Sequence, residues 1–137
     1  MITGISHITF IVKDLKRTAD FFEEIFGAKE VYSRDDCSCP TVKYLLINDL
    51  WIALNKGEPL SERSYNHIAF KISEDEIDKF IEKIKCTGVE IMPERADRIR
   101  TAGEGRSIYF YDFDNHLFEL HTSTLPERLV SYSQIIV

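Results

Sequence analysis

The feature of this sequence that most restricts its fold is an internal repeat. A histidine-bearing β-rich segment, a helical segment and a glycine occur in the same order twice along 137 residues. The matched parts are Ser6–Phe10 with Asn66–Phe70, Gly27 with Gly88 and, more loosely, Asn48–Leu54 with Asn115–Leu120. We interpret this recurrence as two copies of one β-α-β-β-β unit. Two such units, each with one curved sheet, can pair to enclose a cavity.

The first copy has the residue patterns of a strand, a helix and three further strands. Apolar residues at helical spacing predict a helix over Thr18–Phe26, and Gly27 is suited to end it. Arg34–Thr41 contains two aspartates, two cysteines and a proline, and predicts a loop. The predicted strands are Ile5–Val12, Lys29–Ser33, Val42–Ile47 and Leu50–Leu54.

The second copy repeats this order after a polar linker at Lys56–Ser64. Ser73 and Glu76 predict a capping box at the start of a helix that Gly88 ends. Pro93–Ala102, with three arginines, predicts a loop, and Leu125–Ser131 a short helix. The predicted strands are Tyr65–Ile72, Val89–Met92, Ser107–Tyr111 and His116–His121.

These patterns predict an α+β fold with two tandem βαβββ modules, at about residues 1–60 and 61–124. Together with a short helix and tail at 125–137 they are expected to form a single domain, residues 1–137. That length suits one domain or two small fused modules.

Composition excludes several classes of function. The net charge of -6 and the absence of a basic patch disfavour nucleic-acid binding. The sequence contains neither an apolar run long enough to cross a bilayer nor a signal-peptide pattern, so we expect no membrane partner. Three cysteines, Cys37, Cys39 and Cys86, are an odd number without zinc spacing, and indicate free thiols and a cytoplasmic location.

Two histidines and a glutamate form the candidate metal site. His7 and His67 occupy equivalent positions of the two copies, and Glu119 is a carboxylate in the apolar final strand. A lone buried carboxylate is costly unless it is paired or holds a metal. The position that matches Glu119 in the first copy is Ala53, so the ligand set has three members and leaves room for water and a chelating substrate. Ligand type alone would allow manganese, iron, zinc or nickel. We assign His116 and His121 to polar packing or to support of the site.

With these residues in place, the chain resembles the vicinal oxygen chelate superfamily, which includes glyoxalase I and extradiol dioxygenases. It closely resembles the superfamily's fosfomycin-resistance group, particularly the FosX-type epoxide hydrolases. The segments that carry the resemblance are Ile5–Leu15, Glu62–Phe70 and Gly103–His121, and Arg128 adds to it. The resemblance implies a glyoxalase-like fold with curved sheets around the metal site.

The resemblance also implies roles for individual residues. His7, His67 and Glu119 would bind Mn²⁺, with another divalent metal as the alternative, in a homodimer whose sites combine ligands from both subunits. Thr9 and Tyr65 match residues near the bound antibiotic, and Tyr109 and Arg128 match residues near its oxirane oxygen and phosphonate. Further substrate-binding candidates are Ser107, Trp51 and Arg100, the last together with Arg95 and Arg98.

The chemistry of fosfomycin fits these residue types. The metal would act as a Lewis acid on the epoxide oxygen, the arginines would neutralise the phosphonate, and Tyr109 would donate a hydrogen bond to the developing alkoxide.

One position departs from the FosX pattern. Those enzymes carry a glutamate just before the third strand as the base that activates water, and the aligned residue here is Val42. Asp36, or its neighbour Asp35, is the candidate replacement. We therefore expect a metal-dependent enzyme that opens the fosfomycin epoxide with water. The alternatives are a transferase that uses a thiol such as glutathione, a metal-free protein that sequesters a small ligand, and a lyase or dioxygenase acting on another oxygenated metabolite.

Overall fold

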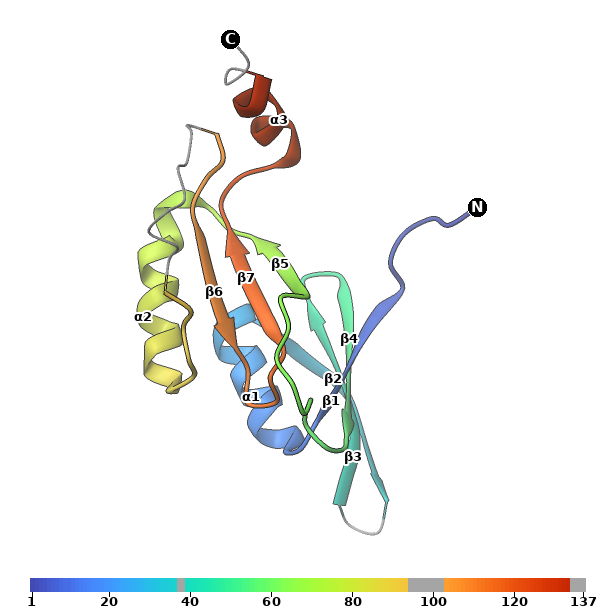
Figure 1. Ribbon diagram of the computed structural model, residues 1–137. Coiled ribbons are helices and arrows are strands. Elements are labelled where there is room, and N and C mark those ends of the chain that lie inside the picture. The colour runs from blue at the N-terminus through green and yellow to red at the C-terminus, as the bar shows by residue number, and fades with distance from the viewer. Residues whose placement is uncertain (37–38, 94–102, 134–137) are drawn as a thin grey trace. The chain divides into compact units, whose positions relative to one another are not determined.

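A computed structural model describes residues 1–36, 39–93 and 103–133 of the chain. The chain divides into two compact units (Figure 1). Unit 1 comprises Met1–Arg63 and Phe113–Asn115, and unit 2 comprises Ser64–Asp112 and His116–Val137. The α+β fold of two βαβββ-type modules, each with its own mixed sheet, agrees with the expectation from the sequence.

Unit 1 contains a four-stranded sheet with one helix packed on it. Strand β1 pairs in parallel with β4, and the other neighbours are antiparallel, in the order β1-β4-β3-β2. Helix α1 packs on β3 and β4. The elements are β1 (His7–Val12), α1 (Leu15–Phe26), β2 (Lys29–Asp36), β3 (Cys39–Ile47) and β4 (Leu50–Lys56).

Helix α1 begins three residues earlier than predicted because Asp14 is its N-cap. The Asp14 carboxylate accepts a hydrogen bond from the backbone N–H of Arg17 at 3.0 Å. At the other end Gly27 adopts the left-handed conformation, with φ 66°, as predicted. Phe22 and Ile25 are buried, and each contributes roughly 1.5–3 kcal/mol through loss of apolar surface.

The predicted loop over Arg34–Thr41 is wrong for most of its length. Strand β2 extends to Asp36 and strand β3 begins at Cys39, and these two residues pair with each other. Every residue of β2 is exposed, so a burial pattern could not reveal the strand. The ladder relies on backbone hydrogen bonds, with a register irregularity between Arg34 and Asp35, and these bonds do not depend on side-chain polarity.

Unit 2 contains a three-stranded sheet in the order β5-β7-β6, with α2 packed along β6. Strands β5 and β7 are parallel, and β6 and β7 form the antiparallel hairpin predicted from the sequence. The elements are β5 (His67–Lys71), the 3₁₀ turn η1 (Glu74–Glu76), α2 (Ile77–Thr87), β6 (Ser107–Tyr111), β7 (Leu117–His121) and α3 (Leu125–Ser133).

Two local predictions for unit 2 need correction. The Ser73 side chain makes no capping bond, because a 3₁₀ turn precedes α2 and the backbone carbonyl of Ser73 accepts from Glu76 instead. Val89–Met92 is not a full strand: it contains a single bridge between Ile91 and Phe110, flanked by backbone hydrogen bonds to β6. Gly88 ends α2 with φ 78°, as predicted.

The strand registers confirm the alignment of the two copies. Thr9 pairs with Ala53 in unit 1, and the equivalent pair in unit 2 is Ala69 with Glu119. The preceding turns each contain an asparagine at positive φ, 52° at Asn48 and 70° at Asn115. The register also makes Val42, which pairs with Asn55, the equivalent of Ser107, which pairs with His121.

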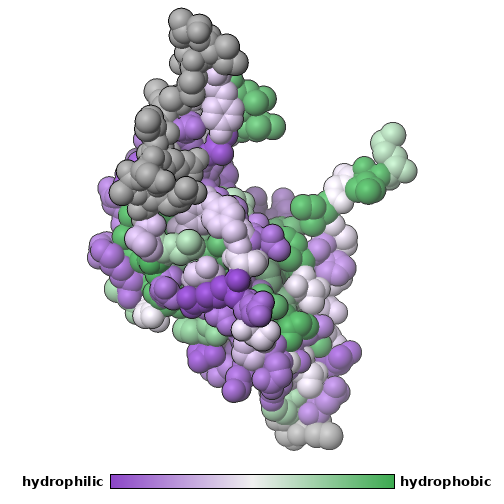
Figure 2. Space-filling model, in the orientation of Figure 1, coloured by the Kyte–Doolittle hydropathy of each residue, from purple (hydrophilic) through white to green (hydrophobic). Residues whose placement is uncertain are grey.

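Helix α3 carries most of its large apolar side chains on its outer face. Leu125, Leu129 and Val130 are exposed, and Ser131 is its buried residue. Figure 2 shows apolar surface beside the C-terminal part of the chain, where α3 lies. Among the described residues, no helix is long and apolar enough to cross a membrane.

Candidate active site

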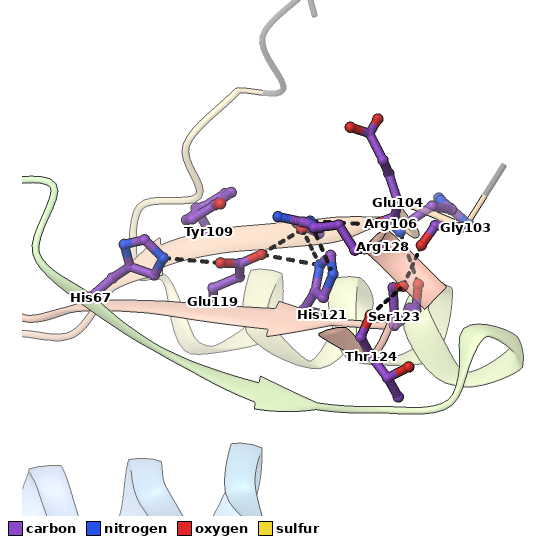
Figure 3. A network of polar contacts seen from close by, with 12 residues as sticks. His67, Gly103, Glu104, Arg106, Tyr109, Glu119, His121, Ser123, Thr124 and Arg128 are labelled. Carbon is purple, nitrogen blue, oxygen red and sulfur yellow. Dashed lines mark hydrogen bonds and ion pairs between the residues drawn. The ribbon is translucent and has the colours of Figure 1, made fainter. Parts of the chain in front are cut away.

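The centre of the candidate site is the pair His67 and Glu119 in unit 2. Parallel pairing of β5 with β7 brings the two side chains together, and His67 Nε2 lies 3.0 Å from Glu119 Oε1 (Figure 3). Glu119 is only 6% exposed although it is a carboxylate. Burial of an ionised carboxylate requires a partner of positive charge or several donors.

The hydrogen bond on the other side of the His67 ring determines what Glu119 faces. His67 Nδ1 lies 2.7 Å from the backbone carbonyl oxygen of Tyr65, which can only accept, so Nδ1 is the donor. In a neutral imidazole this leaves a lone pair on Nε2, directed at the carboxylate oxygen. Two lone pairs converge at this point, and a cation between them satisfies both. Imidazole nitrogen and carboxylate oxygen therefore fit a divalent metal such as Mn²⁺.

Tyr109 lies beside this pair because β6 places it directly opposite Glu119. Its ring contacts that of His67, with centroids 5.3 Å apart, and its hydroxyl lies 3.0 Å from the hydroxyl of Tyr65. Partial burial raises the pKa of Tyr109, and the hydrogen bond to Tyr65 and the negative charge of Glu119 raise it further. Tyr109 is therefore a neutral phenol near pH 7 and can donate a proton in a hydrogen bond.

A chain of polar contacts extends from the other oxygen of Glu119 (Figure 3). The Ser107 hydroxyl donates to Glu119 Oε2 at 2.6 Å and contacts His121 Nδ1 at 2.7 Å. His121 Nε2 lies 3.2 Å from Arg128 Nη2, and Arg128 also donates to the carbonyl of Glu104 at 3.3 Å. Six sequence-predicted site residues of unit 2 thus lie in one connected region: Tyr65, His67, Ser107, Tyr109, Glu119 and Arg128.

The remaining described candidates belong to unit 1. His7 lies at the start of β1, where its ring contacts that of Trp51, its partner in the strand register, with centroids 4.2 Å apart and planes tilted by 33°. The buried indole N–H of Trp51 has no acceptor among the described residues. Thr9 is exposed two residues along β1. Asp36 is exposed at the end of β2, where its carboxylate accepts from Thr41 at 3.3 Å.

Three of the predicted residues cannot be placed relative to the site. Arg95, Arg98 and Arg100 lie outside the described residues. Within residues 1–36, 39–93 and 103–133, no three His, Cys, Asp or Glu side chains form a cluster that could hold a metal. Unit 2 by itself supplies two of the three predicted ligands.

The sequence did not predict the individual partners of the other two histidines. His116 pairs with the buried Asp112 at 2.7 Å, in agreement with its assignment to polar packing. His121 contacts Ser107, Glu119 and Arg128. Its position two residues after Glu119, on the same face of β7, is the sequence signal for this contact.

Comparison with known proteins gives concordant matches. Residues 4–120 match the family described as the Glyoxalase/Bleomycin resistance protein/Dioxygenase superfamily. A fosfomycin resistance protein FosX from Listeria innocua is 58% identical over 134 residues, covering 96% of this chain and 98% of its own.

Two crystal structures of FosX from Listeria monocytogenes have the same fold. One, a complex with Mn(II) and sulfate, has TM-score 0.86 and 56% identity, covering 96% of this chain and 99% of its own. The other, of a variant with Mn(II) and 1S,2S-dihydroxypropylphosphonic acid, has TM-score 0.87 and 55% identity over the same shares.

Proposed function

We propose that this chain, which belongs to the glyoxalase/bleomycin resistance/dioxygenase superfamily and within it to the FosX fosfomycin resistance proteins, is an Mn²⁺-dependent hydrolase of the fosfomycin epoxide. Water addition to that epoxide yields 1,2-dihydroxypropylphosphonic acid, the compound held by the Listeria monocytogenes relative. The observation that carries the proposal is the convergence of His67 Nε2 and Glu119 Oε1 at 3.0 Å, beside a neutral Tyr109.

Each residue of the proposed site has a separate role in binding or opening the epoxide. When bound by His67, Glu119 and His7, Mn²⁺ supplies a Lewis acid for the epoxide oxygen. Tyr109 donates a hydrogen bond to the oxygen on which negative charge develops as the ring opens. Arg128 binds the phosphonate, and the guanidinium neutralises part of its charge. Ser107, whose hydroxyl proton is donated to Glu119, is a further residue of the substrate site. Thr9, Tyr65, Trp51 and Arg100 complete the substrate contacts in this proposal.

The proposal includes a homodimer in which each metal site takes His7 from one subunit and His67 and Glu119 from the other. Its support is that unit 2 provides two of the three proposed ligands, whereas His7 belongs to unit 1. A cytoplasmic location is also part of the proposal. Its support is that Cys39 and Cys86 are free, exposed thiols, the form that a reducing compartment maintains.

Position 42 favours a second candidate, transfer of a thiol to the same epoxide. Val42 is 8% exposed in β3 and carries no group that can accept a proton from water. The candidate replacement, Asp36, is exposed and accepts a hydrogen bond from Thr41. A thiol that arrives as thiolate needs no such base. Hydrolysis remains our first proposal because the chain is similar over nearly its full length to FosX proteins, at 58% identity to the one from Listeria innocua.

Phosphorus NMR of fosfomycin incubated with enzyme and Mn²⁺, with and without glutathione, distinguishes the two reactions. Hydrolysis predicts the diol without thiol, and loss of the diol in Asp36→Asn at unchanged Mn²⁺ affinity. Formation of a thioether adduct only when thiol is present would establish the second candidate. No phosphorus-containing product in either sample would exclude both.

A further inference from the structure

The donor chemistry of Arg128 indicates which tautomer the His121 ring adopts. A guanidinium has five N–H donors and no acceptor, so its contact with His121 Nε2 at 3.2 Å requires a lone pair on Nε2. A neutral ring then carries its proton on Nδ1. The Nδ1 atom lies 2.7 Å from Ser107 Oγ and 3.2 Å from Glu119 Oε2.

The direction of each following bond is determined by this proton. Because His121 Nδ1 donates to Ser107 Oγ, the hydroxyl proton of Ser107 is available for Glu119 Oε2, 2.6 Å away. The bonds therefore run in one direction, from Arg128 through His121 and Ser107 to Glu119 (Figure 3). A carboxylate held at Oε2 keeps Oε1 on the side of His67. Supporting bonds of this kind orient metal ligands.

The surroundings of His121 indicate that this orientation is fixed. His121 lies at the end of β7, and its side chain is 14% exposed. Arg128 lies on α3, and its second bond, to the carbonyl of Glu104, anchors the guanidinium on the chain segment before β6. The imidazole thus lies between the two parts of the proposed site that carry opposite charge, the metal-binding carboxylate and the phosphonate-binding guanidinium.

We propose that His121 is a positioning residue that orients Glu119 through its Nδ1–H and Arg128 through its Nε2 lone pair. The inference rests on the proposed function for the roles of these two groups. It assigns to one imidazole two separable effects, one on metal affinity and one on phosphonate affinity.

Two conservative variants separate the effects. Asparagine places an amide N–H near the position of Nδ1, and glutamine places an amide oxygen near the position of Nε2. In His121→Asn we expect Mn²⁺ affinity to stay close to wild type while propylphosphonate, an unreactive probe, binds about tenfold more weakly. In His121→Gln we expect the reverse, with Mn²⁺ affinity reduced about tenfold or more. His121→Leu should lose both.

The measurements are Mn²⁺ titration followed by electron paramagnetic resonance and calorimetric titration of the Mn²⁺-loaded protein with propylphosphonate. The matched control is His116→Asn, on the other histidine of the β6–β7 hairpin, whose partner is Asp112. We expect this control to lower Tm and to leave both affinities unchanged.

Two results would overturn the inference: wild-type affinities in the asparagine and glutamine variants, or equal loss of both affinities in the two variants in proportion to lost Tm. If His121→Leu does not fold, the two amide variants decide. The proposed hydrolysis can fail separately, because neither binding measurement requires turnover.

Discussion

At the scale of single residues, the chemistry of the candidate site depends on the unusual position of the Glu119 carboxylate. It is buried on an apolar strand, and one of its oxygens faces a ring nitrogen whose lone pair is left exposed by the bond from Nδ1 to the Tyr65 carbonyl. With a neutral His67 ring, two lone pairs face each other in the protein without metal, and a divalent cation between them relieves this repulsion. Metal binding should accordingly stabilise the fold.

Replacement of Glu119 by glutamine should affect the Tm differently in the metal-free and in the Mn²⁺-loaded protein. In metal-free Glu119→Gln the amide N–H can donate to His67 Nε2 and the buried charge is gone, so we expect a Tm a few degrees higher than wild type. Addition of Mn²⁺ should raise the Tm of wild type but not of the variant, because the anionic ligand is missing. Thermal unfolding with and without Mn²⁺ measures both effects.

The exposed Glu82→Gln is the control for this substitution, and its Mn²⁺-induced shift should equal that of wild type. An equal shift in Glu119→Gln and wild type would show that Glu119 is not a ligand.

At the scale of elements, the segment before β6 holds Ser107 in place through contacts with the segment after β7. Arg106 N–H donates to the Thr122 hydroxyl at 2.8 Å, the Ser123 hydroxyl donates to the carbonyl of Gly103, and Thr122 N–H donates to the carbonyl of Arg106. Gly105 lies within this junction at φ 74°. A Cβ built there would lie 2.7 Å from the Ser123 Cβ and the Thr122 hydroxyl.

Substitutions of two glycines with nearly the same φ distinguish the cost of backbone strain from the cost of a steric clash at the new Cβ. Gly88→Ala, at φ 78° with open space around its Cβ position, should cost only the left-handed strain of about 1–2 kcal/mol in free energy of unfolding. Gly105→Ala, at φ 74°, adds displacement of packed atoms at about 1–3 kcal/mol. We also expect Gly105→Ala, and not Gly88→Ala, to weaken Mn²⁺ binding through Ser107. Urea unfolding and Mn²⁺ titration test this pair, and equal effects of the two substitutions would contradict it.

At the scale of the whole molecule, the proposed ligands are divided between two units of the chain. His67 and Glu119 meet within unit 2, whereas His7 belongs to unit 1. Helix α3 exposes Leu125, Leu129 and Val130, an apolar face that a second subunit could cover. If the site is shared as proposed, a single chain lacks one of its ligands, and activity requires the dimer.

Subunit complementation tests the shared site. We expect His7→Ala and Glu119→Ala each to be inactive as homodimers. After the two are unfolded together and refolded as an equal mixture, about half of the dimers are mixed, each with one intact site, so about a quarter of wild-type activity should return. Sites built within single chains would give no recovery. A mixture of His7→Ala with His7→Ala,Glu119→Ala is the control and should stay inactive.

The sequence by itself determined the two-copy fold, the helices with their glycine ends, and the equivalence of Ala53 and Glu119. Periodicity and repetition are visible in the order of residues, without knowledge of tertiary contacts. The sequence predicted strands at Lys29–Ser33 and Val42–Ile47 but not their extension to Asp36 and from Cys39, because the backbone bonds of this part of the ladder leave no trace in side-chain polarity. Only the tertiary structure decided that His67 presents a lone pair to Glu119 and that His121 joins Ser107 to Arg128. These relations depend on strand register and on the direction of hydrogen bonds between residues far apart in the sequence.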